Sequence, residues 1–396
     1  MPTNYTDGQQ EFLDALLAGK NIFLTGKAGT GKSWIVKRAI ELLKKNKKKV
    51  VALAPTGVAA NNIIGQTIHS FFSISPFGMI TYENANWIKG EKRKMIDMLD
   101  VVFIDEVSML RSDILDGINI TLLKNGCKKI NKIQWIFIGD MKQLEAPVDD
   151  NIRSVLLQSY KGVEWSHARC FDKLAPVTIE LSEIMRQSDQ DFIDALNVVR
   201  DGGKAPYFRQ FVHQEPHGII LAPHNDTVQK WNRIGLSELT TQLHRFKATI
   251  HGEAKMQDFN LEETVEVKDG ARIMYLVNSQ ADNNLFNGTI GTFVEDEGNF
   301  FIQVGGVNYS LERVTISKKK YVLNEGEDDF ELKEIGSITQ YPIRLAYALS
   351  IHKSQGLTFE HVTIDLTRPT FGNGMMYTAL SRVTGPGGLR IIAPHA

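Results

Sequence analysis

One octapeptide has the residue types and spacing of a phosphate-binding loop. Gly26-Lys27-Ala28-Gly29-Thr30-Gly31-Lys32-Ser33 matches G-x-x-x-x-G-K-[ST] and follows an apolar, strand-like run at 21–25. In such a loop the backbone N–H groups surround a phosphate, and the helix that follows directs its positive dipole end at the same anion. We expect Lys32 to reach the β- and γ-phosphates and the Ser33 hydroxyl to hold Mg²⁺. The pattern therefore predicts a nucleoside triphosphate site.

A pair of acids supplies the other half of a hydrolytic site. The apolar run 99–104 ends in Asp105 and Glu106, which is typical of a buried parallel strand that delivers acids to its carboxyl edge. Ligands bind at that edge in open α/β sheets. We expect Asp105 to bind Mg²⁺ and Glu106 to polarise the attacking water. Alone, the pair is equally compatible with a solvated loop.

Three further side chains are candidates for sensing or stabilising a γ-phosphate. Gln143 follows a third apolar strand, at 133–139, and Arg186 and Arg382 lie in the second half of the chain. An arginine donated to a transferring phosphoryl group offsets its developing charge. For any one of the three, a polar loop residue or an exposed ion pair is the alternative.

Composition limits the class of protein. With 396 residues, 42% of them apolar, the chain is expected to form two or three domains. Its two cysteines make neither a disulfide framework nor a zinc site, and the first residues lack a signal or transit pattern. No apolar stretch is long enough to span a membrane, so we expect an intracellular protein. Since the formal net charge is −1, any site for a polyanion must be local.

Strands and helices alternate along most of the chain, which predicts α/β architecture. A first unit, with strands at 21–25, 49–54, 101–105 and 133–139, is expected to end near residue 170. A second begins near Pro176 and includes a strand at 218–222, a helix at 226–240, a helix at 343–354 and strands at 361–366 and 389–393. The β-rich stretch 270–338, with turn signals such as Gly305-Gly306, is interpreted as an insertion.

Nine motifs occur in the order found in the Pif-family DNA helicases of superfamily 1, the branch that includes RecD and Dda, and the chain resembles that family along essentially its whole length. The motifs are Gln10, residues 26–33, 54–60 (APTGVAA), 67–71 (TIHSF), 103–109 (FIDEVSM), 139–144 (GDMKQL), 185–187 (MRQ), 348–356 (ALSIHKSQG) and 379–382 (ALSR).

The resemblance implies a fold of two RecA-like P-loop NTPase domains, at 1–170 and 171–396. A wedge subdomain is expected at about 71–97, and an SH3-like β-module at about 280–338. It implies that Gln10 reads the adenine, that Arg186 and Arg382 contact the γ-phosphate, and that Gly356 couples nucleotide to DNA. It assigns the DNA groove to Pro55, Thr56, His69, Phe71, His352 and Lys353. One departure is Glu145, which places a carboxylate near the expected DNA path.

The function implied is an ATP- and Mg²⁺-dependent DNA helicase that moves 5′→3′ on single-stranded DNA and unwinds duplex or forked DNA. We expect it to act as a monomer in the cytoplasm, at the nucleoid, of a bacterial or phage-infected cell. One alternative is a nucleic-acid-stimulated ATPase or clamp that does not separate strands. Another is a nucleotide switch or small-molecule kinase, which needs only the first domain.

Overall fold

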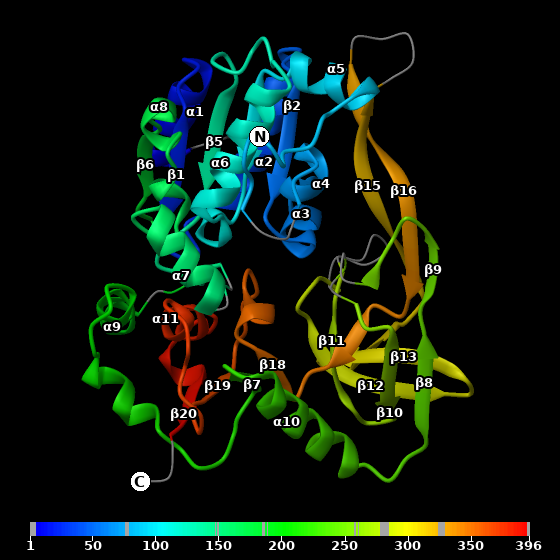
Figure 1. Cartoon of the computed structure of the whole chain (residues 1–396). Helices are drawn as coiled ribbons and strands as arrows, with labels where there is room; N and C mark the ends of the chain where they lie inside the picture. The colour runs from blue at the N-terminus through cyan, green and yellow to red at the C-terminus, as the bar shows by residue number, and fades with distance from the viewer. Residues whose placement is uncertain are drawn as a thin grey trace. The chain divides into compact units, whose positions relative to one another are not determined.

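The computed structural model divides into two compact units, which are described separately. It describes residues 5–75, 79–146, 148, 150–183, 187, 189–256, 259, 261–277, 285–323 and 329–393. The first unit contains Met1–Met141, Glu145–Arg186 and Lys319–Ile335, and the second contains Lys142–Leu144, Gln187–Lys318 and Gly336–Ala396. Figure 1 shows the order of the elements along the chain.

The first unit is built on a parallel sheet of order β3-β2-β4-β5-β1-β6. Its strands are β1 (Ile22–Gly26), β2 (Val50–Ala54), β3 (Gln66–Thr67), β4 (Val101–Ile104), β5 (Gln134–Ile138) and β6 (Val177–Leu181). Strands β2, β4 and β5 are buried along their whole length, which explains their continuous apolar sequences. Strand β6 pairs with β1, so the first sheet continues beyond residue 170, where the sequence predicts the boundary.

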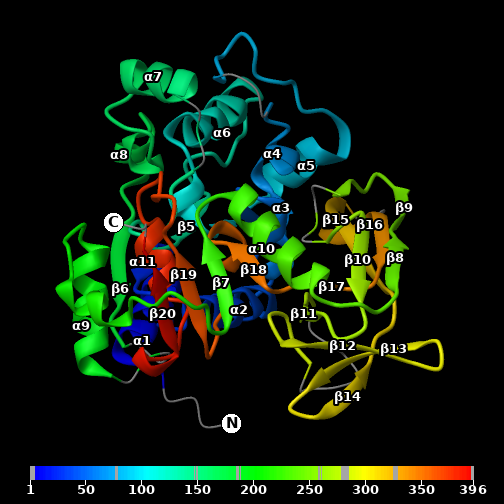
Figure 2. The same cartoon turned by 90° about the horizontal axis from the view of Figure 1, so that it is seen from below.

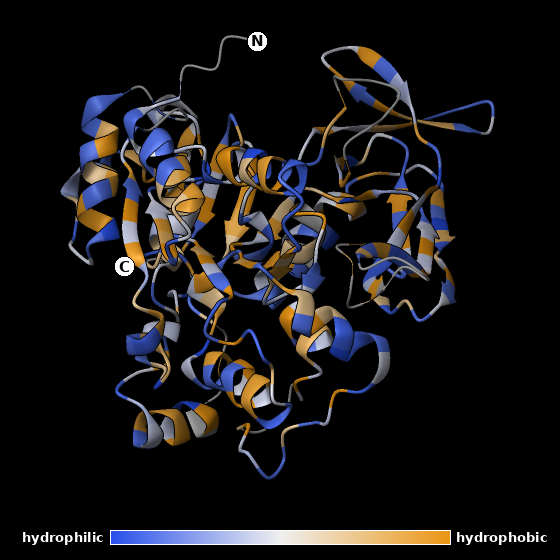
Figure 3. Cartoon of the chain, turned by 90° about the horizontal axis from the view of Figure 1, so that it is seen from above, coloured by the Kyte–Doolittle hydropathy of each residue, from blue (hydrophilic) through white to orange (hydrophobic). Residues whose placement is uncertain are grey.

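Helices of the first unit follow the expected alternation with strands. They are α1 (Asp7–Leu17), α2 (Lys32–Lys45), α3 (Gly57–Asn62), α4 (Ile68–Phe72), α5 (Gly90–Met98), α6 (Ser112–Lys124), α7 (Asp150–Ser159) and α8 (Phe171–Leu174), with short 3₁₀ turns η1 (Val107–Met109) and η2 (Trp165–His167). A capping box between Thr6 and Gln9 starts α1. Helices α1 and α2 bury apolar residues such as Phe12 and Leu16 of α1 and Ile35 and Ala39 of α2, and Figure 3 shows the hydropathy of the residues along the chain.

The expected wedge segment lies against α6. A Cβ added to Gly117 would lie 3.0 Å from Ile80, so this glycine gives the segment room to approach the helix. The Asn125 side chain accepts the Ile88 N–H at 2.7 Å and donates to the Asn86 carbonyl at 3.0 Å. Ile80, Ile88 and their neighbours therefore belong to the core of the first unit.

The second unit contains a parallel sheet of order β18-β7-β19-β20. Its strands are β7 (Ile219–Ala222), β18 (Ala348–Ser350), β19 (Val362–Asp365) and β20 (Leu389–Ile392), seen side by side in Figure 2. The flanking elements are α9 (Gln190–Arg200), α10 (Asn225–Ser237), α11 (Met375–Leu380), η3 (Pro206–Phe211), η5 (His352–Ser354) and η6 (Pro386–Gly388). The α/β class predicted from the sequence is confirmed.

The predicted helix at 343–354 is wrong. This segment forms β17 (Ile343–Leu345), β18 and η5 instead. Ala348 and Leu349 pair with Ile220 and Leu221 of β7, and all three residues of β18 are buried. A short apolar run fits a buried strand as well as a helix, and pairing with a neighbouring strand decides between them.

Antiparallel sheets begin at Leu243, earlier than the β-rich stretch predicted at 270–338, and all of their residues except 319–335 lie in the second unit. One has the order β14-β13-β12-β11-β17, a second pairs β10 with β8, and a third has the order β15-β16-β9. The strands are β8 (Leu243–Lys247), β9 (Thr249–Gly252), β10 (Thr264–Lys268), β11 (Arg272–Tyr275), β12 (Ile290–Asp296), β13 (Asn299–Val304), β14 (Val307–Ser310), β15 (Val314–Leu323) and β16 (Phe330–Gln340). Gly305 and Gly306, both with positive φ, turn β13 into β14 as the sequence predicts.

The far end of the β15–β16 hairpin belongs to the first unit. Tyr321 of β15 is buried, its hydroxyl accepts the Ala52 N–H at 3.1 Å, and its own N–H donates to Gln66 Oε1 at 3.1 Å. Its ring packs edge-on against Phe71. Tyr321 thus completes the hydrogen bonding of β2 beyond the end of the short strand β3.

No helix in the described part of the chain is both long and apolar enough to cross a membrane.

Candidate functional site

The loop after β1 has the backbone of a phosphate cradle. Gly26, Gly29 and Gly31 all have positive φ, of 150°, 85° and 83°. A Cβ on Gly26 would lie 2.6 Å from the Leu181 carbonyl and 2.9 Å from Thr30 Oγ1, so a larger residue does not fit there. Helix α2 starts directly at Lys32, with Gly31 as its N-cap. The loop and the helix dipole therefore suit an anion, as the motif predicts.

Lys32 lies folded over this loop. Its ammonium donates to the carbonyls of Gly26 at 2.6 Å and Lys27 at 2.9 Å, and Thr30 Oγ1 also donates to the Lys27 carbonyl. Ser33 is exposed in the first turn of α2. The buried Thr30 and the Lys32 ammonium thus brace the loop through its own carbonyls.

Two acids follow β4 on the same edge of the sheet. Burial raises the pKa of the Asp105 carboxyl to about 6, although the Glu106 N–H, donated to Oδ1 at 2.9 Å, and the Lys32 ammonium both favour the ionised form. Glu106 has a left-handed backbone, with φ of 53°, which is uncommon outside glycine and recurs at functional sites. The charge of Lys32 acts on Asp105, so the structure brings the two halves of the predicted triphosphate site together.

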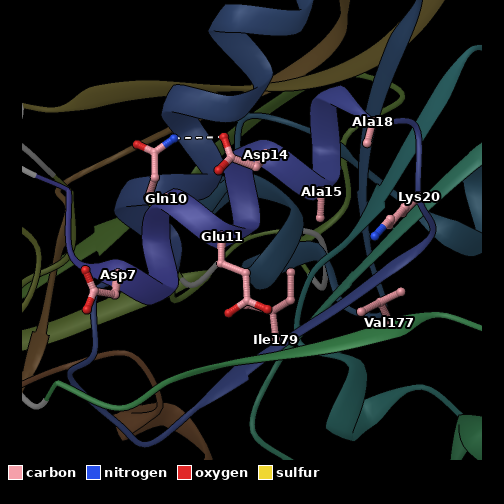
Figure 4. A pocket seen from close by; sticks show the side chains of 9 residues that line it. All are labelled: Asp7, Gln10, Glu11, Asp14, Ala15, Ala18, Lys20, Val177 and Ile179. Atoms are coloured by element: carbon pink, nitrogen blue, oxygen red, sulfur yellow. Dashed lines mark hydrogen bonds between the residues drawn. The ribbon is translucent and has the colours of Figure 1, made fainter.

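The two glutamines of α1 differ in environment. Gln10 is exposed, and its Nε2 donates to Asp14 Oδ1 at 2.9 Å beside a pocket of about 560 Å³ lined mainly by residues of α1 and β6 (Figure 4). Gln9 is buried at 3% exposure, and its Nε2 would lie 3.3 Å from a Cβ on Gly31. Gln9, not the predicted Gln10, thus lies against the phosphate loop. The capping-box pattern Thr6-x-x-Gln9 is the sequence signal that distinguishes them.

The remaining predicted nucleotide contacts lie outside the first unit or outside the described residues. Arg186 is among the residues that the structure does not describe. Gln143 belongs to the second unit, where its carbonyl is close enough to Gly374 to exclude a side chain there.

Arg382 is 1% exposed and donates to the carbonyls of Thr378 and Leu357 and to Ser381 Oγ. Gly356 has φ of 78°, with open space around its Cα.

Most of the predicted DNA-contacting residues of the first unit follow carboxyl ends of strands. Pro55 and Thr56 come after β2 and are partly exposed, and Thr56 Oγ1 accepts the Ala59 N–H at 3.2 Å. His69, in α4 after β3, is also partly exposed, and burial together with the Arg111 charge lowers its pKa. These side chains share one edge of the sheet with the phosphate loop.

The structure contradicts the prediction that Phe71 contacts DNA. Its side chain has no exposed surface and packs edge-on against Phe72 and Tyr321 in the core of the first unit. It therefore has no ring face to offer to a base, and its motif position reflects packing. Phe72 is equally buried.

Glu145, the departure from the family pattern, has a partner in the first unit. Its Oε1 accepts from Arg153 Nη2 at 3.1 Å, so the carboxylate is offset by an adjacent guanidinium.

In the second unit, the predicted DNA contacts His352 and Lys353 begin η5, shortly after β18, and burial lowers the pKa of His352.

Comparisons with known proteins agree on one family. A model described as "PIF1-like helicase" matches residues 6–207. The chain is 30% identical to the ATP-dependent DNA helicase Pif1 of Campylobacter jejuni, over 96% of this chain and 90% of that protein. It is 29% identical to Bacteroides sp Pif1 in complex with ADP-AlF4, with a TM-score of 0.88 and coverage of 100% and 94%. A second Bacteroides structure, with ADP-AlF3 and ssDNA, is 30% identical, with a TM-score of 0.69 and the same coverage.

Proposed function

We propose a mechanism for this chain, which belongs to the PIF1-like helicase family, in which ATP hydrolysis at the first unit's sheet edge drives movement along single-stranded DNA. The chain is an enzyme, an ATP-dependent DNA helicase. The observation that carries the mechanism is the meeting of the phosphate loop, Lys32, Asp105 and Glu106 at the carboxyl ends of β1 and β4. A clamp needs no general base, so this arrangement favours hydrolysis.

The residues of this edge fit a magnesium-bound triphosphate. The glycine cradle and the α2 N-terminus suit the phosphates, and Lys32 would exchange its loop carbonyls for phosphate oxygens. Ser33 and Asp105 are oxygen donors of the kind that Mg²⁺ prefers, and they would hold it. The ion, when bound, neutralises charge on the phosphates. A bound cation would favour the ionised form of Asp105, whose pKa burial raises.

Glu106 is proposed as the general base that orients and deprotonates the attacking water. Its left-handed backbone, directly after the strand end, is the local feature that supports this role. Arg186 and Arg382 remain proposed contacts of the γ-phosphate, Gln143 its proposed sensor and Gly356 part of the proposed coupling segment. Gln9 replaces Gln10 as the proposed reader of the adenine, because only Gln9 lies at the loop.

The DNA contacts are proposed for strand-end residues of both units. Pro55, Thr56 and His69 would contact the strand from the first unit, and His352 and Lys353 from the second. We infer 5′→3′ movement on single-stranded DNA, unwinding of duplex and forked DNA, and activity as a monomer at the chromosome inside the cell. The Bacteroides relative that was solved with ssDNA supports the contact with single-stranded DNA.

ATP turnover with and without single-stranded oligonucleotide tests the proposal. The wild type should hydrolyse ATP much faster when the oligonucleotide is present. Lys32→Ala should lose ATP binding, whereas Glu106→Gln should keep ATP binding and lose turnover by a factor of roughly 10² to 10⁴. Gln10→Ala, on the exposed side of α1, is the control and should behave like the wild type. ATP turnover that is equal with and without the oligonucleotide, or that persists in Glu106→Gln, would contradict the mechanism.

A further inference from the structure

Three aromatic rings follow three adjacent parallel strands in the second unit. His224 comes after β7, His352 after β18 and Phe371 after β19, and these strands are neighbours in the order β18-β7-β19. The Phe371 ring lies 5.1 Å from the His224 ring, tilted by 45°, and 6.1 Å from the His352 ring, nearly parallel at 21°. The three rings therefore form one cluster at the carboxyl edge of the sheet.

The loop that carries Phe371 is tied to the neighbouring strand end. His224 Nε2 lies 3.0 Å from the Pro369 carbonyl, an interaction that requires the ring to donate from Nε2. Arg368 forms an ion pair with Asp226 in the first turn of α10. At the start of the loop, Thr367 donates from both its N–H and its hydroxyl to Asp365. These contacts anchor the loop on the N-terminal side of Phe371.

Phe371 is nonetheless strongly exposed. Its exposed fraction is 65%, although Met375, a few residues later, is fully buried. An apolar ring held in water by its own loop gains nothing for folding, because burial of apolar surface is what stabilises a fold. Burial lowers the pKa of His352, so that this ring stays neutral and presents a flat face to Phe371 at neutral pH.

We propose that Phe371 is a stacking platform for one base of the single strand, with His224 and His352 as the side chains that position its ring. The inference rests on the proposed function and adds a contact of a different kind. Bases of any sequence offer a π-face, so an aromatic platform suits an enzyme that must move along a strand irrespective of sequence. Lys353, next to His352 and exposed, supplies a cation for the adjoining backbone phosphate.

The test is equilibrium binding of the full chain to an oligo(dT) probe of about 16 nucleotides, without ATP. Phe371→Ala should weaken binding roughly tenfold with an unchanged salt dependence, because stacking neutralises no phosphate. Phe371→Trp should retain affinity, whereas Phe371→Leu, apolar but without a π-face, should not. Phe286→Ala removes another exposed phenylalanine, 55% exposed in the same unit, and should leave affinity unchanged.

An abasic scan identifies the contact directly. One abasic site, moved along the single-stranded tail of a duplex whose junction fixes the register, should weaken the wild type at one position, and Phe371→Ala should show no loss at that position. His224→Ala should lower affinity less than Phe371→Ala, since it acts only through the ring. Retention by Phe371→Leu, a changed salt slope, or additive losses from Phe371→Ala and the abasic site would overturn the inference. A wild type that fails to bind the probe would overturn the proposed function as well.

Discussion

At the scale of single residues, Asp105 lowers the stability of the folded protein at neutral pH, which the sequence does not reveal. Asp105 is partly exposed, but its carboxyl is desolvated after β4, and this desolvation raises its pKa to about 6. In the unfolded chain an aspartate ionises near 3.9, so between roughly pH 4 and 6 the folded state binds the proton more tightly. Stability due to this group therefore falls as the pH rises through that window and stays lower above it. A role in binding a cation would explain why an acid occupies this desolvated position.

Asp105→Asn should stabilise the nucleotide-free protein at about pH 8, by up to roughly 3 kcal/mol, because it removes a buried charge yet keeps an acceptor for the Glu106 N–H. The advantage should shrink as the pH falls to about 4, where the wild-type carboxyl is neutral. Denaturant unfolding at both pH values measures it. If the variant and the wild type differed in unfolding free energy by the same amount at both pH values, the raised pKa of Asp105 would be contradicted. A variant less stable than the wild type at about pH 8 would contradict it as well.

Residue-level roles could be predicted from sequence only where a motif fixes the backbone. The glycines, Lys32, Asp105 and Glu106 lie together as expected, since each directly follows a strand end. Gln9 and Gln10 are neighbours on one helix, and only the packing of α1 determines which one faces the loop. Phe71 lies in a motif yet fills the core, because a motif position does not reveal which way a ring points.

At the scale of elements, the β15–β16 hairpin shows what local patterns miss. The sequence predicts a β-rich stretch at 270–338, but nothing in it around Tyr321 indicates that the hydroxyl will bond to Ala52, 269 residues away. Likewise, residues 343–354 contain an apolar run whose pairing with β7 is non-local. Elements whose start and end are marked by nearby residues, such as β1 and α2 on either side of the glycine loop, can be predicted because those residues lie within a few positions of the boundary.

Tyr321→Phe should destabilise the first unit by about 1 to 3 kcal/mol, because the buried Ala52 N–H loses its acceptor. Tyr321→Ala should cost more, roughly 3 to 5 kcal/mol, since it also leaves a cavity against Phe71. Thermal and denaturant unfolding of the full chain measure both. The control is Tyr82→Phe, at an exposed tyrosine, which should have no effect. If Tyr321→Phe were as neutral as the control, the hairpin contact would not stabilise the unit.

At the scale of the whole molecule, the chain has two parallel sheets whose carboxyl edges carry different chemistry. The first has the phosphate loop and the acids, and the second has the rings and cations after β7, β18 and β19. Composition gave no hint of a polyanion partner, because the formal net charge is −1. Positive charge and aromatic surface are instead placed locally at strand ends, the combination that single-strand sites use.

The central claim is that hydrolysis at the Glu106 edge drives directional strand separation. It is tested most directly by displacement of a labelled strand from duplexes with a single-stranded tail at the 5′ or the 3′ end, with Mg²⁺ and ATP. We predict that the wild type unwinds the 5′-tailed duplex and not the 3′-tailed one, and that Glu106→Gln binds both and unwinds neither. Unwinding from the 3′ tail, or strand displacement by Glu106→Gln at the wild-type rate, would contradict the account.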